Sequence, residues 1–313
     1  MDIRHLDLLR ELAGRGSVTE VAKATFRTPS AVSQQLKSAQ REFGMALVEP
    51  HGRGLRLTAA GKLLAQGGAD VAASLERVQA QWDSFVGRPS GTVRIASLPS
   101  AATFLLPKVL ASVADTDLTI QVADYDVAEV EFAALCADND IVVAHSLTGV
   151  RPAGTTGEVV VPICQEPLDV AMGAGHPLAG EPWVVPEQVA QYAWIGVPKG
   201  YPFDTVLASV RGVSGTDLDI RQRIRDNRLI ESLVAADELL AILPRFTTVP
   251  GAGLLLKELR GVPSRRHISA VMRADRAERL AVRTVLEHLR RVGSEVAEAH
   301  GASPAGPCNE ART

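Results

Sequence analysis

Small polar side chains gather at the start of one segment near the N-terminus of this 313-residue chain. The run Thr28-Pro29-Ser30-Ala31-Val32-Ser33-Gln34-Gln35 has the pattern of a helix whose first turns carry hydroxyl and amide groups. Such groups suit a flat surface that offers hydrogen-bond donors and acceptors, and the major groove of DNA is such a surface. The side chains expected to contact DNA are Thr28, Pro29, Ser30, Ser33, Gln34, Lys37 and Arg53.

The ends of this recognition helix carry residues with strong positional preferences. Thr28 can cap the helix by accepting a backbone N–H, Pro29 suits its first turn, and Gly44 ends it. Its apolar residues recur at steps of three to five, which predicts one inward face. That face comprises Ala31, Val32, Leu36 and Ala39, packed against Val21 and Ala22 of a preceding short helix.

Two short extended runs between Leu47 and Thr58 surround the tip Gly52-Arg53-Gly54 and predict a small β-wing. Arg53 at the tip could reach a narrow minor groove, where a guanidinium is favoured electrostatically. We expect Ser33 and Gln34 to contact base edges, and Lys37 and Arg53 to contact the sugar-phosphate backbone or the minor groove. Pro29 and Ser30 would line the entry of the helix.

The segment from Ser17 to Gly61 resembles the winged helix-turn-helix of LysR-type transcriptional regulators. The matching features are Gly16-Ser17, Ala22, the run from Ala31 to Leu36, Gly44, Leu47 and the closing run from Leu57 to Gly61. Pro50, Ala39-Gln40 and Thr25 depart from the residues usual in that family. An ordinary helical hairpin with solvated polar faces is the alternative, but the wing, the caps and the long match together favour DNA binding.

Length and charge suggest a modular protein with a DNA-binding end. A chain of 313 residues exceeds what one core normally organises, so two or three domains are expected. Residues 1–58 hold nine Lys and Arg against six Asp and Glu, whereas residues 91–313 hold 21 against 27. The basic excess of residues 1–58 is modest, so two copies of this DNA-binding domain on one duplex would be needed for useful affinity.

Residues 59–90 predict a long linker helix that ends at the hinge Arg88-Pro89-Ser90-Gly91. Its seam residues are spaced alternately three and four apart, a heptad pattern that favours a homodimer. The alternative is a helix packed on its own domain, because glycines weaken the seam. A homotetramer is also open. The seam consists of Gly61, Leu64, Gly68, Val71, Leu75, Val78, Trp82 and Phe85.

Beyond Gly91, short apolar β runs alternate with amphipathic helices, which predicts parallel strands joined by right-handed helical crossovers. The pattern is similar to the two-lobed, periplasmic-binding-protein-like effector domain of LysR-type regulators. The expected fold is therefore α/β: a winged helix-turn-helix (1–58), the linker helix (59–90) and an effector domain (91–292). Lobe I would comprise about 91–160 and 266–292, lobe II about 161–265, and 293–313 would be a disordered tail.

In such a domain a ligand is expected in the cleft between the lobes, near the carboxyl ends of strands and the N-termini of helices. Unpaired N–H groups and the helix dipole there favour an anion or a carboxylate. Ser100 could instead be only a helix cap, Lys199 only a solvated charge and His145 only a surface residue. The expected effector-binding residues are Ser97, Leu98, Pro99, Ser100, Ala101, His145, Ser146, Pro198, Lys199, Gly200 and Asn227.

Catalysis, cofactors and metals are not expected. The sequence has no G-x-S-x-G elbow, P-loop, H-E-x-x-H pair or complete G-x-G-x-x-G. Its three cysteines form no C-x-x-C pair, so two packed thiols are favoured over a redox switch between Cys136 and Cys164, which stays open. No membrane span or signal peptide is evident, so a cytoplasmic protein is expected.

These observations predict a transcription regulator that binds double-stranded DNA and responds to a small-molecule effector. The alternatives are a DNA-binding protein without a ligand and, less favoured, a metabolic α/β enzyme, because fold alone does not decide function. The effector, the operator and the sign of regulation are not encoded in any motif of the chain.

Overall fold

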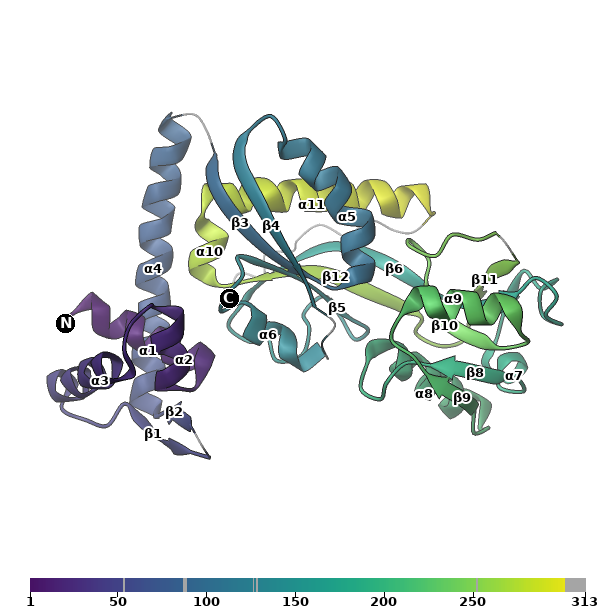
Figure 1. The fold of residues 1–313 in the computed structure, drawn as a ribbon, viewed down its shortest axis with the longest axis horizontal. Helices are drawn as coiled ribbons and strands as arrows, with labels where there is room; N and C mark the ends of the chain where they lie inside the picture. The colour runs from purple at the N-terminus through teal and green to yellow at the C-terminus, as the bar shows by residue number, and fades with distance from the viewer. Residues whose placement is uncertain (53, 87–88, 126, 128, 252, 302–313) are drawn as a thin grey trace.

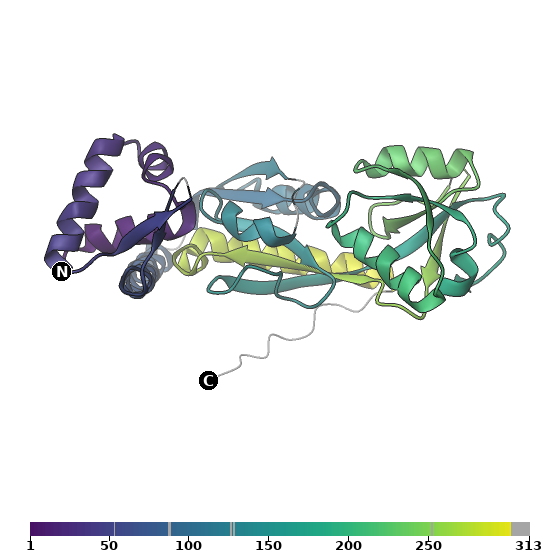
Figure 2. The same ribbon diagram turned by 90° about the horizontal axis from the view of Figure 1, so that it is seen from below.

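The computed structural model describes residues 1–52, 54–86, 89–125, 127, 129–251 and 253–301. Figure 1 shows three parts in a row: an N-terminal group of helices around one long helix, a central α/β lobe and an outer α/β lobe at the far end of the molecule. Figure 2 shows the same elongated arrangement from below. We refer to these parts as the reading head with its linker helix, lobe I and lobe II.

The reading head is a compact helical unit with a two-stranded wing. Its elements are α1 (Ile3–Arg15), α2 (Val18–Ala24), α3 (Pro29–Phe43), β1 (Val48–His51) and β2 (Gly54–Leu57). The predicted inward residues Val21, Val32 and Ala39 are buried, together with Leu9 of α1 and Leu47. Helix α1 is an element that our sequence patterns did not identify, although its leucines recur at helical spacing.

The linker helix α4 (Ala59–Val86) follows the wing directly. A Cβ at Gly61 would lie 2.0 Å from the carbonyl oxygen of Leu47, and one at Gly68 would lie 2.8 Å from that of Leu6. Only glycine permits so close an approach of the helix to the head. The predicted dimer seam is therefore wrong at Gly61 and Gly68, which are buried against the chain's own reading head.

The two lobes share one long strand, β6 (Val159–Gly173), and the sheet order runs β4-β3-β5-β12-β6-β10-β8-β9. Lobe I contains β3 (Ser90–Ser97), β4 (Asp117–Asp124), β5 (Ile141–Ser146), β12 (Arg265–Met272) and the first part of β6. Lobe II contains β7 (Trp183–Val184), β8 (Ala193–Gly196), β9 (Asp219–Arg223), β10 (Leu240–Pro244), β11 (Leu254–Leu259) and the rest of β6.

The chain crosses from lobe I to lobe II on β6 and returns on β12, which pairs antiparallel with β6. The expected parallel pairing is present between β3 and its neighbours β4 and β5, and between β8 and its neighbours β9 and β10. The predicted parallel pairing does not extend to β12, which pairs antiparallel with β5 as well. A strand that returns between two lobes must run against the strand that left.

Helices cover the sheets on both sides. They are α5 (Pro99–Val113), the 3-10 turn η1 (Glu129–Glu131), α6 (Phe132–Leu135), α7 (Pro186–Val189), α8 (Pro202–Ser214), α9 (Asn227–Ala236), α10 (Ala274–Glu278) and α11 (Leu280–Ala299). Among the described residues, no helix combines the length and the apolar character needed to cross a membrane.

Helix α11 runs further than predicted and corrects the expected start of the tail at residue 293. A Cβ at Gly293 would lie 2.6 Å from Cγ2 of Ile163, so the missing side chain lets α11 pack closely on β6. Val296 and Ala297 are buried as well. The composition of this stretch resembled a solvated tail, but burial of its few apolar residues keeps it helical to Ala299.

Candidate DNA-reading surface and ligand cleft

The recognition helix α3 has the predicted caps. Oγ1 of Thr28 accepts the backbone N–H of Ala31 at 3.2 Å and lies 3.0 Å from Oγ of Ser30. Pro29 occupies the first turn, and Gly44 ends the helix in the left-handed conformation with φ 69°. These contacts fix where the helix begins and therefore which side chains lie at its tip.

Most of the predicted DNA-contact residues lie on the open side of α3. Thr28, Pro29, Ser30, Gln34 and Lys37 are exposed, and Ser33 is half-buried. Arg53, predicted at the tip of the wing, lies outside the described residues. The two strands that bear the tip are paired, with Val48 opposite Leu57, and the N–H of Leu55 donates to the carbonyl oxygen of Gly16 at 2.9 Å.

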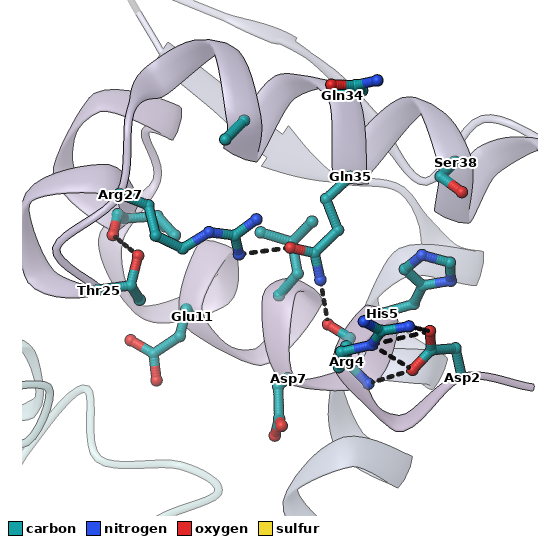
Figure 3. A pocket seen from close by; sticks show the side chains of 13 residues that line it. Asp2, Arg4, His5, Asp7, Glu11, Thr25, Arg27, Gln34, Gln35 and Ser38 are labelled. Carbon is teal, nitrogen blue, oxygen red and sulfur yellow. Dashed lines mark hydrogen bonds and ion pairs between the residues drawn. The ribbon is translucent and has the colours of Figure 1, made fainter.

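Two adjacent glutamines of α3 have different surroundings (Figure 3). Nε2 of Gln35 donates to the carbonyl oxygen of Arg4 at 2.6 Å, and Nη1 of Arg27 donates to Oε1 of Gln35 at 2.5 Å. Gln35 thus braces α3 against α1 and against the turn that precedes α3. Gln34 is exposed and has no hydrogen bond among the described residues, so its amide is free for an external partner.

The turn between α2 and α3 contains a strained aromatic residue that our sequence reasoning missed. The N–H of Arg27 donates to the carbonyl oxygen of Ala22 and that of Phe26 to Lys23, the hydrogen bonds of a Schellman cap. Phe26 occupies the position where glycine is usual, with φ 53°, and its side chain is 98% exposed. The cap therefore gains no packing from the ring.

A cavity of about 340 Å³ lies between the two lobes. Lobe I contributes the start of α5, Tyr125 and the cleft ends of β5 and β12, and lobe II contributes the segments that precede and begin α8 and α9. The lining residues are Leu98, Pro99, Ser100, Thr103, Tyr125, Val127, His145, Val197, Tyr201, Phe203, Arg225, Asp226, Asn227, Arg228, Glu231, Thr247 and Arg266.

Five of the eleven predicted effector-binding residues line this cavity: Leu98, Pro99, Ser100, His145 and Asn227. The other six, Ser97, Ala101, Ser146, Pro198, Lys199 and Gly200, are not among its lining residues. Ser97, Ala101 and Ser146 are buried in the protein, and the side chain of Lys199 is exposed. Val197 and Tyr201, on either side of the predicted loop, line the cavity instead.

A buried ion pair underlies the cavity. Arg266 is 1% exposed and Glu166 is 0% exposed, and two nitrogens of the guanidinium donate to Oε2 of Glu166 at 2.8 and 2.5 Å. The guanidinium also donates to Oγ of Ser100 at 2.9 Å and to Nδ1 of His145 at 3.1 Å. Because Glu166 neutralises the charge of Arg266, the pair orients its neighbours rather than presenting a free cation.

The hydrogen bond from Arg266 fixes the tautomer of His145. A guanidinium can only donate, so Nδ1 of His145 accepts, and the neutral ring carries its proton on Nε2. Burial and then the positive charge of Arg266 hold the pKa of His145 well below its ordinary 6.5. His145 is therefore a neutral N–H donor at the cavity wall, and Nε2 has no partner among the described residues.

Helices α5, α8 and α9 begin at the cleft and differ in their readiness for an anion. Asp226 caps α9 by accepting the N–H of Leu229 at 2.9 Å, so a carboxylate already occupies that end. The N-cap residues of α5 and α8, Leu98 and Tyr201, make no side-chain capping hydrogen bond. The uncapped N-termini and positive dipole ends at the cleft therefore belong to α5 and α8.

The two described cysteines are unreactive in this fold. Burial is the main cause that raises the pKa of both Cys136 and Cys164 to about 12. Thiols with so high a pKa form little thiolate at neutral pH, and the thiolate is the species that reacts. This environment favours two packed thiols over a redox switch.

Comparison with known families identifies both parts of the chain. Residues 3–62 match the family described as bacterial regulatory helix-turn-helix protein, lysR family. Residues 87–294 match the LysR substrate binding domain family, which covers more than half of the chain. The chain belongs to the LysR family of transcriptional regulators. It is a DNA-binding transcription regulator and not an enzyme, as the resemblance implied.

Relatives within the LysR family cover the chain almost completely. The probable HTH-type transcriptional regulator LrrA of Synechococcus elongatus is 26% identical over 95% of this chain and 99% of its own length. The RuBisCO operon transcriptional regulator of Allochromatium vinosum is 24% identical over 90% of this chain and 92% of its own. The similarity to these two regulators therefore extends along nearly the whole chain.

Solved structures of two OxyR proteins have the same fold. A full-length OxyR variant from Pseudomonas aeruginosa matches with a TM-score of 0.61 at 14% identity over 94% of this chain and 95% of that chain. An OxyR mutant from Corynebacterium glutamicum matches with a TM-score of 0.57 at 19% identity, covering 96% of each chain. At such low identity the likeness establishes the architecture alone.

Proposed function

We propose that this regulator reads its operator with the exposed face of α3 and responds to a small carboxylate bound between its lobes. The observation that carries the first half is the contrast between Gln34, which is free, and Gln35, which is committed to Arg27 and Arg4. One glutamine holds the helix in place, and the other is available to a base edge.

The remaining polar side chains of α3 have distinct roles in this proposal. Ser33 and Gln34 contact base edges, Thr28, Pro29 and Ser30 form the tip that enters the major groove, and Lys37 contacts the phosphate backbone. Arg53 at the wing would reach the adjacent minor groove. Support by analogy comes from a solved structure of full-length CbnR with its target DNA, which matches this chain with a TM-score of 0.51.

We infer that two chains associate through α4. The helix presents a stripe of large apolar side chains to solvent, which a monomer rarely exposes without a partner. Because Gly61 and Gly68 face the chain's own head, the stripe begins at the next seam position. It comprises Val71, Leu75, Val78, Trp82 and Phe85, and the last three are 64%, 60% and 84% exposed.

The proposed effector carries an oxyanion and an apolar body. Donors at the lobe I side of the cleft are the α5 amides, the Ser100 hydroxyl and Nε2–H of His145, whereas Arg266 is already neutralised. Arg225 lies over the ring of Tyr201 at 5.1 Å, and no ion pair to it is present among the described residues. Phe203, Tyr125 and Val127 supply the apolar wall.

The effector proposal is tested by thermal unfolding of the full chain against a panel of small carboxylates and their neutral amides. Carboxylates are expected to raise the melting temperature, and Ser100→Ala should weaken the best of them about tenfold, the cost of one hydrogen bond to a charged group. Ser209→Ala on α8 is the matched control, since its hydroxyl bonds its own helix. Neutral amides that raise the melting temperature as much as the carboxylates do would contradict the proposal that the effector carries an oxyanion.

A regulator without an effector is the second candidate. The cavity argues against it, because a space of about 340 Å³ with convergent polar groups is typical of a small-molecule site. The two candidates separate in a footprint of operator DNA recorded with and without the best carboxylate of the panel. A changed pattern supports the sensor, and an unchanged pattern with no thermal shift supports the ligand-free binder. We propose a cytoplasmic location, because the proposed target is operator DNA.

A further inference from the structure

Three ion pairs join the reading head to lobe I. Nη1 of Arg10 donates to Oδ2 of Asp275 at 2.6 Å, and Nη1 of Arg273 donates to Oε1 of Glu11 at 3.1 Å. Nη2 of Arg15 donates to Oδ1 of Asp138 at 2.8 Å, and also to the carbonyl oxygen of Ala137 at 3.2 Å. We call these six charged side chains, at positions 10, 11, 15, 138, 273 and 275, the interdomain cluster.

The interdomain cluster is more than a set of surface contacts. Five of its six side chains are 10–19% exposed, and only Asp138 is open to solvent at 69%. Three cations meet three carboxylates, so the cluster is balanced. Ion pairs with so little water around them are screened less by salt than exposed pairs. Removing one partner of such a pair also lowers the stability of the protein more.

Neighbouring arginines lower the pKa of two carboxyl groups of the cluster, those of Glu11 and Asp275. Burial opposes the ionisation of Glu11, but Arg273, Arg15 and Arg10 overcome it and lower the pKa of its carboxyl. Burial also opposes the ionisation of Asp275, and Arg273, Arg10 and Arg276 lower its pKa. Glu11 and Asp275 are therefore carboxylates at neutral pH.

A second contact runs alongside the cluster. Helix α10 packs along α4, as Figure 1 shows, and Arg77 of α4 pairs with Glu278 of α10 at 3.1 Å. Arg273 is the N-cap residue of α10, and Asp275 lies in its first turn. The orientation of α10 thus determines both the cluster and the contact with the linker helix.

Two paired strands connect the cluster to the ligand cleft. Strand β12 has Arg266 near its cleft end and is followed directly by Arg273. Its neighbour β5 carries His145 at the cleft, opposite Ile268, and begins just after Asp138. At about 3.3 Å per residue, the run from Arg266 to Arg273 spans about 23 Å without an intervening loop, whereas residues 138–140 form a short turn between Asp138 and β5.

We propose that the interdomain cluster holds the reading head in a fixed position on lobe I and that occupation of the cleft is transmitted to it along β5 and β12. Arg273 and Asp275 are then positioning residues for α3. The transmission rests on the proposed function of the cleft, whereas the holding role does not. A ligand that displaces Arg266 and His145 would shift β12 and β5, and with them Arg273 and Asp138 at the far ends of these strands.

The holding role is tested by double electron-electron resonance between spin labels at Thr19→Cys and Asp115→Cys, two exposed sites on the head and lobe I. Cys308→Ser removes the tail cysteine, the two buried native cysteines do not label, and excess unlabelled protein restricts the signal to one chain. We expect one narrow distance distribution. Arg273→Glu should broaden it, Glu11→Arg with Arg273→Glu should narrow it again, and Arg291→Glu on the exposed surface of α11 should leave it unchanged.

A distribution that stays narrow in Arg273→Glu would overturn the holding role, and so would equal broadening in Arg291→Glu. All of these distance distributions are recorded on protein without DNA and without effector. A protein that fails to bind any DNA fragment would therefore contradict the proposed function and leave this result standing.

The transmission is tested by filling the cleft covalently. In a Cys308→Ser, Ser100→Cys protein, 2-sulfonatoethyl methanethiosulfonate attaches an anionic group at the start of α5. Affinity for a DNA fragment from beside the protein's own coding region should change about fivefold or more with the cluster intact, and less than about twofold with Arg273→Glu added. An equal change in both proteins, or no change with the cluster intact, would overturn the transmission.

Discussion

The residues proposed to contact DNA in the reading head are close together in the sequence, whereas the residues that line the ligand cleft are far apart. The tip of α3 presents side chains from one run of ten residues, between Thr28 and Lys37, on one face of one helix. The cleft collects its side chains from both lobes, and Arg266 lies 100 residues from its partner Glu166. A local motif therefore describes the head well, whereas the cleft depends on how two crossing strands bring distant segments together.

The comparison also concerns burial. At the head Gln34 and Lys37 are exposed, because the partner proposed for them is external. At the cleft the buried charges of Arg266 and Glu166 satisfy one another before a ligand arrives. Loss of an exposed head residue should therefore affect binding, and loss of one of these buried charges should affect stability first.

The largest expected effect lies in the cleft. Arg266→Met leaves the buried carboxylate of Glu166 without its partner, which should lower the free energy of unfolding by about 3–5 kcal/mol. Urea unfolding of the full chain measures it. Arg291→Met, in an exposed pair, should cost less than about 1 kcal/mol, and adding Glu166→Gln to Arg266→Met should recover part of the loss. Equal losses for the two arginines would remove the contrast between the regions.

The next effect lies in the head. Gln34→Ala should weaken operator binding by about 1–3 kcal/mol and relax the base preference at one position, because a base contact is lost. Fluorescence anisotropy with a set of single-base operator variants measures it. Lys37→Ala should weaken all sequences alike and reduce the salt slope by about one. Gln35→Ala is the neighbouring control, expected to destabilise the head without relaxing any one position.

The protonation of His145 gives a pH test of the cleft. The pKa of His145 is lowered well below 6.5 in the folded protein, so below pH 6.5 the unfolded chain binds a proton that the folded chain does not bind. The contribution of neutral His145 to the free energy of unfolding is therefore fully present above pH 6.5. It is lost as the pH falls further, at up to about 1.4 kcal/mol per pH unit. Urea unfolding at several pH values should show a shallower dependence for His145→Gln. An unchanged slope would mean that His145 is not neutral in the fold.

The smallest effect concerns the strained turn. Phe26→Gly should raise the free energy of unfolding of the head by about 0.5–1 kcal/mol, since glycine tolerates φ 53° and the exposed ring makes no packing contribution. Thermal unfolding measures it, with Phe26→Ala as the control that keeps the strain. A destabilised Phe26→Gly protein would show that the ring has a structural partner.

The elements most accurately predicted from sequence are those set by local preferences. The caps Thr28 and Gly44 define α3, and the seam spacing predicts α4. The direction of β12 was not predictable, because it depends on the chain's return from lobe II. Gly61 and Gly68 fit the seam spacing, yet they serve backbone contacts with the head that no helical period reveals.

In the cleft, strand ends and helix starts identified Ser100, His145 and Asn227, which line the cavity. Arg266 was missed because a lone arginine in a strand carries no sign of its buried partner. Tyr125 and Phe203 were missed because an aromatic residue at a strand or helix end looks the same whether it faces a core or a cavity. Only the packing of the two lobes distinguishes these cases.

The central claim is that copies of α3, held in pairs by α4, read one face of a DNA duplex. The most direct measurement is a hydroxyl-radical footprint of the full-length protein on DNA from beside its coding region. The account predicts two protected half-sites separated by about 10 base pairs or a multiple of that spacing, both lost together in Gln34→Ala. A single protected site, or protection that survives Gln34→Ala unchanged, would contradict it.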